Sequence, residues 1–156
     1  MNAPYFSAGN QLAQVHKKEE LVKLLDAVGI ELDISESQHK EAEGRYNAVG
    51  DWLARQGGLL SGAIIYPQGS AAIGTTTKPI NTNEFDVDLI CLLPNMLGYT
   101  AAEIKAAVRN GLLASQVYAR MLIEKNRCWR LDYANQFHLD ITPAILNPYC
   151  TMGGLL

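Results

Sequence analysis

The sequence of 156 residues is poor in cysteine and contains no long hydrophobic run. Its three cysteines, Cys91, Cys128 and Cys150, are odd in number and form no C-x-x-C pair. Neither a disulfide framework nor a zinc ribbon is therefore predicted, and we expect a reduced, cytoplasmic location. Wholly apolar runs such as Leu89–Leu93 fall far short of the ~20 residues that a membrane-spanning helix needs. The N-terminus lacks the basic-then-apolar order of a signal peptide, so no membrane partner is expected.

The sequence also lacks an excess of positive charge. Lys and Arg together number 13 and Asp and Glu 16, which gives a net charge of -3 with the histidines neutral. Proteins that hold a long nucleic acid by its phosphates rely on a basic excess, so no long nucleic acid is required as a partner. Small nucleotides are not excluded as ligands, because a local site can hold them. Apolar residues make up 48% and charged residues 19%, which excludes a disordered or fibrous chain.

Hydrophobic periodicity predicts two helices in an N-terminal helical segment, residues 1–60. The first carries an apolar stripe with the i, i+3, i+4, i+7 spacing of an amphipathic helix, and Gly29 is expected to end it. The second begins at a capping-box pattern, Ser35 with Gln38 three residues on, and ends at Gly57-Gly58. The stripes are Leu21, Leu24, Leu25 and Val28, then Ala42, Tyr46, Val49 and Leu53 with Trp52 beside them. The aromatic side chains of the second helix are expected to pack in the core.

Residues 61–156 have a different pattern, in which short apolar runs alternate with turns and helical segments. Predicted strands cover 63–66, 85–93, 128–133 and 137–142, and the first of them is expected to be buried. Predicted helices begin at the Thr100–Glu103 capping box and cover 115–124. Pro94 ends the second strand, and Ala134-Asn135-Gln136 joins the last two strands as a hairpin. This order predicts an α/β (α+β) fold, with a mixed sheet and N-terminal helices packed on it.

The segment Asp86-Val87-Asp88 places two acidic residues inside an apolar strand. Because side chains alternate along a strand, the two carboxylates face one side while Phe85 and Val87 face the other. Two residues along a strand span about 6.6 Å, which lets both carboxylates reach the same pair of cations. Asp140 has the same alternating position in the last strand. If the two strands are neighbours, three carboxylates converge on one face of the sheet.

Three carboxylates on one face carry a large electrostatic cost. Two like charges about 4 Å apart cost about 4 kcal/mol at an effective dielectric constant near ~20, so the cluster either raises a pKa or recruits divalent cations. Mg²⁺ prefers oxygen ligands and binds through carboxylates together with substrate phosphates. The pattern therefore predicts two Mg²⁺ ions, with Mn²⁺ as a substitute, at Asp86, Asp88 and Asp140. His138, beside Asp140, is expected to pack or to support a ligand rather than to bind metal.

A glycine-serine turn, Gly69-Ser70, directly follows the first predicted strand. Gly69 permits a tight turn with close backbone approach, and a short helix that begins here would direct free N–H groups at an anion. Because this turn precedes the acidic strand along the chain, we predict a phosphate site followed by a metal site. Thr75 is a further candidate phosphate contact.

A P-loop is the rival interpretation of the same glycines. Gly69 and Gly74 have the Gly-x₄-Gly spacing of that motif, and Thr76 stands at its Ser/Thr position. The P-loop lysine, however, would fall at position 75, where this chain has a threonine. Without that charge on the phosphates the P-loop interpretation is disfavoured.

Four segments resemble the bacterial cyclic oligonucleotide synthases. These are the cyclic GMP-AMP synthase/DncV-like nucleotidyltransferases (CD-NTases) of antiphage signalling (CBASS), within the polymerase-β-like superfamily. The segments are Tyr66–Ser70, Gly74–Thr77, Glu84–Cys91 and Phe137–Ala144. The Gly-Ser turn, the Asp-x-Asp strand and the third Asp occur in the family's order, and the resemblance covers nearly the whole chain.

The resemblance implies a role for each matched residue. Gly69 and Ser70 would bind the triphosphate of the donor nucleotide, and Asp86 and Asp88 would hold the Mg²⁺ ions that bridge its phosphates. Asp140 would ligate the catalytic ion and help to deprotonate the attacking ribose hydroxyl. The family joins nucleoside triphosphates, here ATP or GTP, into cyclic oligonucleotides with release of pyrophosphate, and the product activates a downstream effector.

Members of the family are considerably longer than this sequence and continue into a helical lobe that closes over the nucleotides. The sequence therefore looks like the N-terminal catalytic half, with residues 61–156 as the nucleotidyltransferase core and the C-terminal helical lobe absent. Two other functions stay open: a nucleotide-binding or assembly module without catalysis, and a minimal antitoxin-like transferase that places AMP on a protein.

Overall fold

A computed structural model of the chain describes residues 8–78, 84–134 and 136–147. Its contacts group the chain into two compact units, Met1–Asp33 and Ile34–Leu156, which we describe separately. The predicted division after residue 60 follows a change of sequence pattern rather than contacts, and it stays a prediction. Cys150, and Asn135 of the predicted hairpin loop, lie outside the described residues.

In the first unit the described residues, from position 8 on, form one helix, α1 (Ala8–Leu32). The prediction that this helix ends at Gly29 is wrong, because the Asp33 amide donates to the Gly29 carbonyl at 3.0 Å and the helical pattern continues. A glycine inside a helix costs about 1 kcal/mol relative to alanine, which neighbouring turns can offset. The side chains of the stripe Leu21, Leu24, Leu25 and Val28 are exposed. None of the described helices is both long and apolar enough to cross a membrane.

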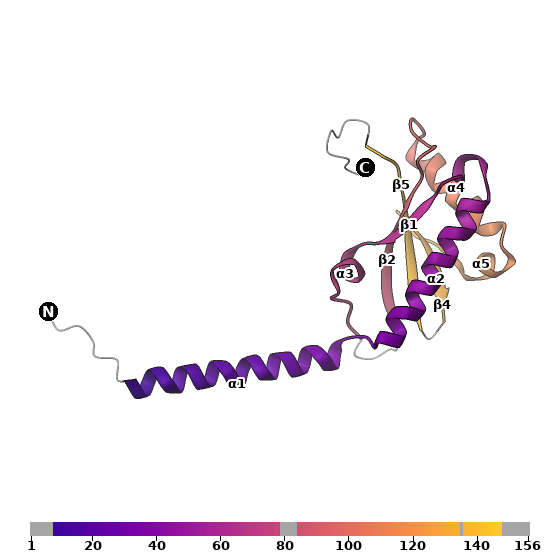
Figure 1. The fold of residues 1–156 in the computed structure, drawn as a ribbon. Coiled ribbons are helices and arrows are strands. Elements are labelled where there is room, and N and C mark those ends of the chain that lie inside the picture. Colours follow the sequence, from indigo (N-terminus) through magenta and orange to yellow (C-terminus); the bar gives the residue numbers. More distant parts are fainter. Residues whose placement is uncertain (1–7, 79–83, 135, 148–156) are drawn as a thin grey trace. The chain divides into compact units, whose positions relative to one another are not determined.

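The second unit is built on one mixed five-stranded sheet (Figure 1). Its strands are β1 (Ile64–Pro67), β2 (Phe85–Leu92), β3 (Leu122–Glu124), β4 (Trp129–Tyr133) and β5 (Phe137–Ala144). They lie in the order β1-β2-β5-β4-β3, and β2 and β5 are parallel whereas the other neighbouring pairs are antiparallel. The predicted mixed sheet is thereby confirmed, and β2 and β5 are direct neighbours.

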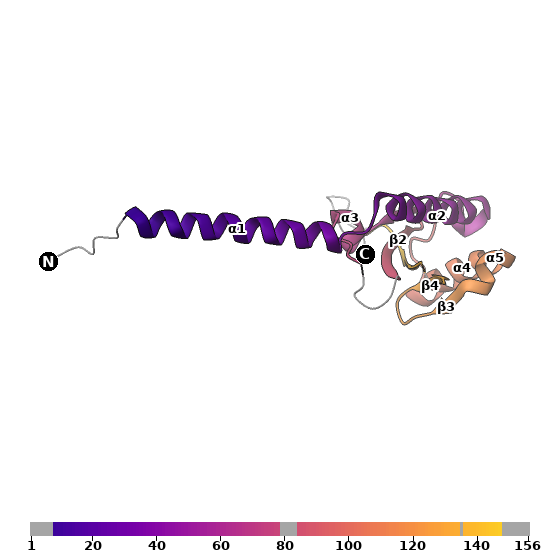
Figure 2. The same ribbon diagram turned by 90° about the horizontal axis from the view of Figure 1, so that it is seen from below.

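Helices α2 (Glu36–Arg55) and α4 (Ala101–Leu113) pack beside each other on the apolar side chains of the sheet (Figure 2). The Trp52 indole joins them by donating to the Gly111 carbonyl at 2.9 Å. Each helix begins at the capping box expected from the sequence, at Ser35 and at Thr100. A short 3-10 turn, η1 (Gly58–Leu60), follows α2. The predicted packing of an N-terminal helix on the sheet is confirmed for α2.

Two local predictions differ from the structure. The helical stretch predicted for 115–124 ends as α5 (Gln116–Met121), because Leu122 turns to extended backbone and pairs with Leu131 as strand β3. The first strand is expected to be buried, but β1 lies at the edge of the sheet, where Ile64 is 54% exposed. Neither error moves β2 or β5, the strands that carry the acidic residues.

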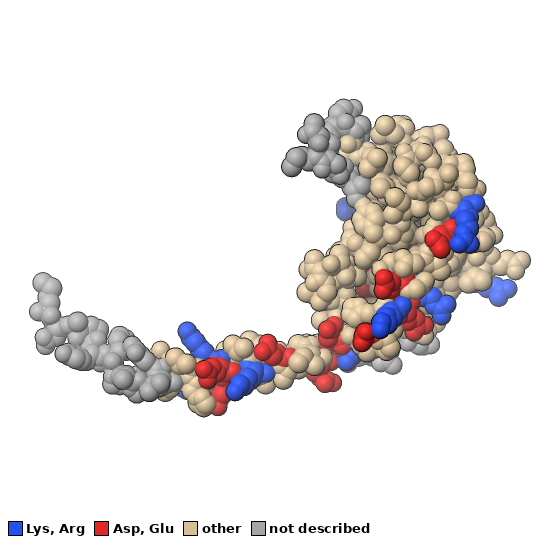
Figure 3. Space-filling view, viewed as in Figure 1, with Lys and Arg blue, Asp and Glu red and all other residues tan. Residues whose placement is uncertain are grey.

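Acidic and basic side chains are interspersed on the face that Figure 3 shows, along both α1 and α2. Several form ion pairs one helical turn apart, such as Glu36 with Lys40 at 2.6 Å and Asp51 with Arg55 at 3.5 Å. Exposed pairs of this kind contribute only about 0.3–0.5 kcal/mol each. On this face the two signs of charge therefore alternate along the helices.

Candidate functional site

The parallel pairing of β2 and β5 brings the three predicted carboxylates to one face of the sheet. Asp88 stands directly opposite Asp140 in the register, and Asp86 stands opposite His138. The alternate residues point to the core, where Val87 is 3% exposed and Leu139 is fully buried. Asp86 is exposed, whereas Asp88 and Asp140 are half-buried. Neighbouring strands lie about 4.8 Å apart, so the carboxylates of Asp88 and Asp140 are close enough to interact.

Arg130 on β4 binds two of these carboxylates. Its Nε donates to Asp140 Oδ1 at 2.7 Å, and its Nη2 donates both to Asp140 Oδ2 at 2.7 Å and to Asp86 Oδ1 at 3.0 Å. Two parallel bonds between a guanidinium and a carboxylate are the strongest form of this ion pair. The hydrogen bond to Asp140 is the first cause that raises the pKa of the Arg130 guanidinium above its usual value.

Arg130 was missed by the sequence analysis, although the predicted hairpin contains the signal that finds it. Tyr133 pairs with Phe137 in the antiparallel register, and counting back from that pair places Arg130 opposite Asp140. Trp129 on one side of Arg130 faces the core, so Arg130 must face the carboxylates. The register of a hairpin, rather than any motif, thus identifies this residue.

The electrostatics of the site centre on Asp88. Desolvation is the largest of the effects that raise the pKa of the Asp88 carboxyl, and the negative charges of Asp140 and Asp86 add to it. The positive charge of Arg130 opposes this shift. The electrostatic repulsion within the cluster therefore acts on Asp88, and a bound cation would reduce this repulsion.

The predicted glycine-serine turn lies directly against Asp88. It opens the short helix α3 (Gly69–Ile73), and Gly69 adopts a positive φ of 58°. A Cβ at Gly69 would come within 2.9 Å of Asp88 Oδ2, closer than real Cβ atoms approach other atoms. The preceding amide, of Gln68, donates to the Asp88 carbonyl at 2.8 Å. Both the backbone conformation and the space at position 69 thus require glycine.

A cavity connects this turn to the acidic strand. It has a volume of about 280 Å³ and is lined by Ser70, Thr75, Thr76, Thr77, Glu84, Phe85 and Asp86. The buried Thr76 hydroxyl donates to Ser70 Oγ at 3.3 Å, and the Thr75 amide donates to the Ser70 carbonyl at 2.9 Å. The structure therefore brings the predicted phosphate contacts Ser70 and Thr75 into one cavity with Asp86.

His138 lies at the edge of the carboxylate face, between two further acidic side chains. Its Nε2 is 3.2 Å from Glu84 Oε2, and its Nδ1 is 3.3 Å from Asp132 Oδ1. Its imidazole is thus placed by acidic neighbours on β4 and ahead of β2. The expected role of His138, to pack or to support a ligand, stays a prediction.

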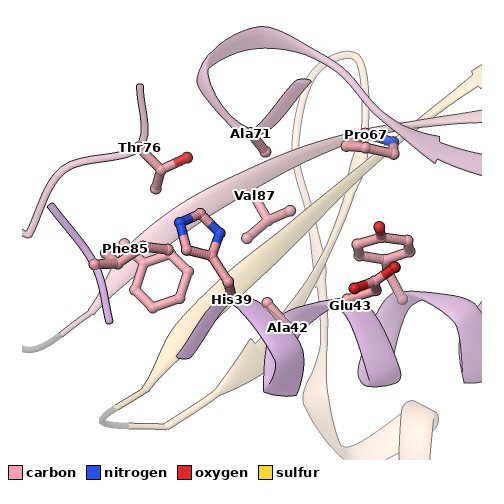
Figure 4. Close-up of a pocket in the computed structure, with 10 residues that line it drawn as sticks. His39, Ala42, Glu43, Pro67, Ala71, Thr76, Phe85 and Val87 are labelled. Atoms are coloured by element: carbon pink, nitrogen blue, oxygen red, sulfur yellow. The ribbon is translucent and has the colours of Figure 1, made fainter. Parts of the chain in front are cut away.

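A second hollow, of about 210 Å³, opens on the other side of the sheet (Figure 4). It is lined by His39, Ala42 and Glu43 from α2, Ala71 from α3, and Phe85 and Val87 from β2, together with Ile34, Tyr46, Pro67 and Thr76. Phe85 and Val87 alternate with the acidic residues of β2, so this hollow faces away from the carboxylates. Thr76 and Phe85 line both hollows.

The donor set fits a hard divalent cation, because carboxylate oxygens are the ligands that Mg²⁺ and Mn²⁺ prefer. As placed, the side chains of residues 8–78, 84–134 and 136–147 form no group of three or more His, Cys, Asp or Glu arranged to hold a metal. In this arrangement both oxygens of Asp140 accept hydrogen bonds from Arg130. The three carboxylates share a face, but two of them, Asp86 and Asp140, are bound by the arginine.

Comparisons with known proteins agree with this geometry. Residues 64–143, which include β1, α3, β2 and most of β5, match the family described as "Cyclic GMP-AMP synthase DncV-like, nucleotidyltransferase domain". The chain is 33% identical over 137 residues to a c-di-GMP synthase of Roseivirga ehrenbergii, a match that covers 86% of this chain and 35% of that protein. It is also 33% identical over 132 residues to the cyclic dinucleotide synthase CdnG of Bradyrhizobium diazoefficiens, covering 81% of this chain and 30% of CdnG.

Solved structures show the same fold. The structure of Bradyrhizobium diazoefficiens CdnG in complex with GTP superposes with a TM-score of 0.68 and 30% identity, over 81% of this chain and 38% of CdnG. The Cid1 poly(U) polymerase bound to MgATP superposes with a TM-score of 0.56 at 20% identity, over 80% of this chain and 38% of Cid1. The chain spans about a third of the length of the two curated relatives.

Proposed function

Because the chain belongs to the family of DncV-like nucleotidyltransferase domains, we propose that it transfers a nucleotidyl group from one nucleoside triphosphate to a ribose hydroxyl of another nucleotide. In this reaction the hydroxyl oxygen bonds to the α-phosphorus, the bond to pyrophosphate breaks, and pyrophosphate leaves. The observation that carries the proposal is the register of β2 and β5, which sets Asp88 opposite Asp140 beside the Gly69 turn.

The carboxylates of Asp86, Asp88 and Asp140 are the proposed holders of two Mg²⁺ ions. Divalent ions bound there would withdraw charge from the phosphates and lower the pKa of the attacking hydroxyl. Asp140 is the proposed acceptor of the proton from that hydroxyl. The fit rests on the donor chemistry of the three carboxylates, and it is supported by Cid1, which shares the fold and was solved with MgATP.

The turn at Gly69 is the proposed site for the triphosphate of the donor nucleotide. Ser70 and Thr75 line the cavity that reaches Asp86, and their hydroxyl groups are the proposed donors to phosphate oxygens. The absence of a side chain at Gly69 lets the backbone lie against Asp88, so phosphates bound by the turn would lie close to the carboxylates. The turn positions the leaving group, and the carboxylate face holds the charge that the reaction must balance.

Guanine nucleotides are the proposed substrates, with ATP as an alternative or a second substrate. Support comes from the names of the two curated relatives, a c-di-GMP synthase and CdnG, and from the GTP in the solved structure of CdnG. The proposed product is a cyclic dinucleotide that signals to a downstream effector in antiphage defence, as the four matching motifs imply. The chain spans about a third of the length of these relatives.

Incubation of the protein with a mixture of nucleoside triphosphates and Mg²⁺ tests the proposal. Release of pyrophosphate and a new oligonucleotide is expected from the unaltered chain. Both should be lost in the double variant Asp86→Asn/Asp88→Asn and kept in the control Asp51→Asn, which makes the same change on the exposed surface of α2. Nucleotide binding without product would identify a binding module instead, and label from ATP on a protein band would identify a protein AMP-transferase.

A further inference from the structure

We propose that Arg130 occupies the place of a divalent cation in the metal-free protein and competes with that cation for Asp86 and Asp140. The inference rests on the proposed function, which places cations at the same carboxylates, and it assigns Arg130 a role of its own. When an ion binds, Nη2 of Arg130 must leave Asp86. Arg130 thereby sets the cation concentration at which the site is filled.

The contacts of Arg130 have the form that such an exchange requires. A single nitrogen, Nη2, donates to Asp86 Oδ1 at 3.0 Å and to Asp140 Oδ2 at 2.7 Å, so it lies between the two carboxylates. A cation that binds both groups needs the same space and the same oxygens. Both the guanidinium and the cation are positive, so they also repel each other at that distance.

Arg130 is bound more firmly to Asp140 than to Asp86. The side chains of Arg130 and Asp140 are 20% and 17% exposed and are joined by two bonds of 2.7 Å. The Asp86 side chain is 59% exposed and is joined to Arg130 by the single longer bond. The contact to Asp86 is therefore the one that breaks first, while Nε stays on Asp140 and keeps the guanidinium next to the site.

Asp88 differs from the other two carboxylates, because among the described residues Arg130 donates hydrogen bonds to Asp86 and Asp140 and none to Asp88. Its carboxylate stands opposite Asp140 and touches the Gly69 turn. An incoming cation can meet Asp88 first and then take Asp86 from the arginine. The guanidinium thus stabilises the carboxylate face when no ion is bound and yields to an ion of higher charge.

Calorimetric titration of the full chain with Mn²⁺ tests this role, using the variant Arg130→Gln and the control Arg109→Gln. Arg109 is exposed on α4, so the control removes the same charge away from the carboxylates. We expect Arg130→Gln to bind Mn²⁺ about tenfold more tightly than the unaltered chain, equivalent to about 1.4 kcal/mol. We also expect its melting temperature to be lower without Mn²⁺ and to rise more steeply as Mn²⁺ is added. Arg109→Gln should match the unaltered chain in both measurements.

Equal or weaker Mn²⁺ binding by Arg130→Gln would overturn the inference and leave the proposed function intact, because Arg130 would then only support the fold or orient Asp140. If neither protein binds Mn²⁺, the proposed metal chemistry itself fails, and the inference fails with it. Should Arg130→Gln not fold, Arg130→Lys keeps the charge but loses the paired bonds. It should bind Mn²⁺ more tightly than the unaltered chain, and unchanged or weaker binding would overturn the inference.

Discussion

The two faces of the strand pair β2 and β5 differ more than any other two regions of the molecule. On one face Leu89, Leu139 and Ile141 are fully buried under the helices. On the other face Asp86, Asp88 and Asp140 share a surface with one arginine. One face of this strand pair therefore stabilises the domain, and the other face carries the residues of the proposed chemistry.

This difference teaches that register, not composition, makes the site. A slip of one residue between the parallel strands would turn Asp88 toward the core and Leu89 toward solvent, since the side chains alternate with a period of two. The buried face makes that slip costly, because each large apolar side chain contributes roughly 1.5–3 kcal/mol when buried. The apolar face thus fixes the carboxylates opposite each other.

The largest expected effect follows from a change on the acidic face. The variant Asp88→Asn should lower the rate of pyrophosphate release by at least about 10³-fold, because several kcal/mol of charge stabilisation would be lost with the ions. Its melting temperature should be equal or higher, since burial and the neighbouring negative charges, which raise the pKa of Asp88, mean that its ionised carboxylate destabilises the fold. A marked loss of stability in this variant would contradict the division between the faces.

A change on the apolar face should have the opposite signature. Leu139 is fully buried one residue before Asp140. The variant Leu139→Ala should lower the free energy of unfolding by about 2–5 kcal/mol. Denaturant unfolding measures this loss, and the folded fraction should still bind Mn²⁺. Ile123→Ala, at an edge position that is 42% exposed, is the control and should cost far less. Loss of Mn²⁺ binding with unchanged stability would break the comparison.

The turn at Gly69 sharpens the comparison because the backbone itself lies against the acidic face. Gly69→Ala should weaken GTP binding about tenfold or more, since a Cβ there meets Asp88 Oδ2 and the positive φ adds roughly 1–2 kcal/mol of strain. Gly74→Ala is the matched control: it has a φ of 68°, but apart from its chain neighbours no atom of the described residues lies within 4 Å of the added Cβ. Equal losses of GTP affinity in both variants would show that strain alone, rather than the contact with Asp88, is responsible.

The smallest effect is expected at Thr76, which is 4% exposed and donates to Ser70. Thr76→Val keeps the shape but removes the hydroxyl, and a lost hydrogen bond of this kind is worth about 0.5–1.5 kcal/mol. GTP binding should therefore weaken by about three- to tenfold. The neighbouring exposed Thr77→Val should change it less, and a larger effect at Thr77 would count against the role given to the Ser70–Thr76 pair.

Much of this site could be predicted from the sequence because its information is local. Alternation within β2 places Asp86 and Asp88 on one side, and the capping boxes at Ser35 and Thr100 mark the starts of α2 and α4. The sequence does not predict that β2 pairs with β5; it predicts only that the three carboxylates converge if these two strands are neighbours. Contacts between residues far apart in the sequence decide which strands are neighbours, and no short sequence motif predicts these contacts.

What the sequence analysis missed depends on such longer-range contacts. The position of Arg130 depends on the hairpin register, which sets it opposite Asp140, and on its hydrogen bond to Asp86 on β2. Strand β3 has only three residues and is recruited by pairing with β4. Gly29 is predicted to end a helix, but it does not adopt the left-handed conformation in which glycine commonly ends one.

The most direct test of the account is a crystal structure of the chain with Mn²⁺ and a non-hydrolysable GTP analogue, with the ions located by their anomalous scattering. The account predicts Mn²⁺ between the carboxylates of Asp86 and Asp88, with the triphosphate on the turn at Gly69 and Ser70. Ions or triphosphate bound away from this face, for example in the hollow beside His39 and Glu43 (Figure 4), would contradict it.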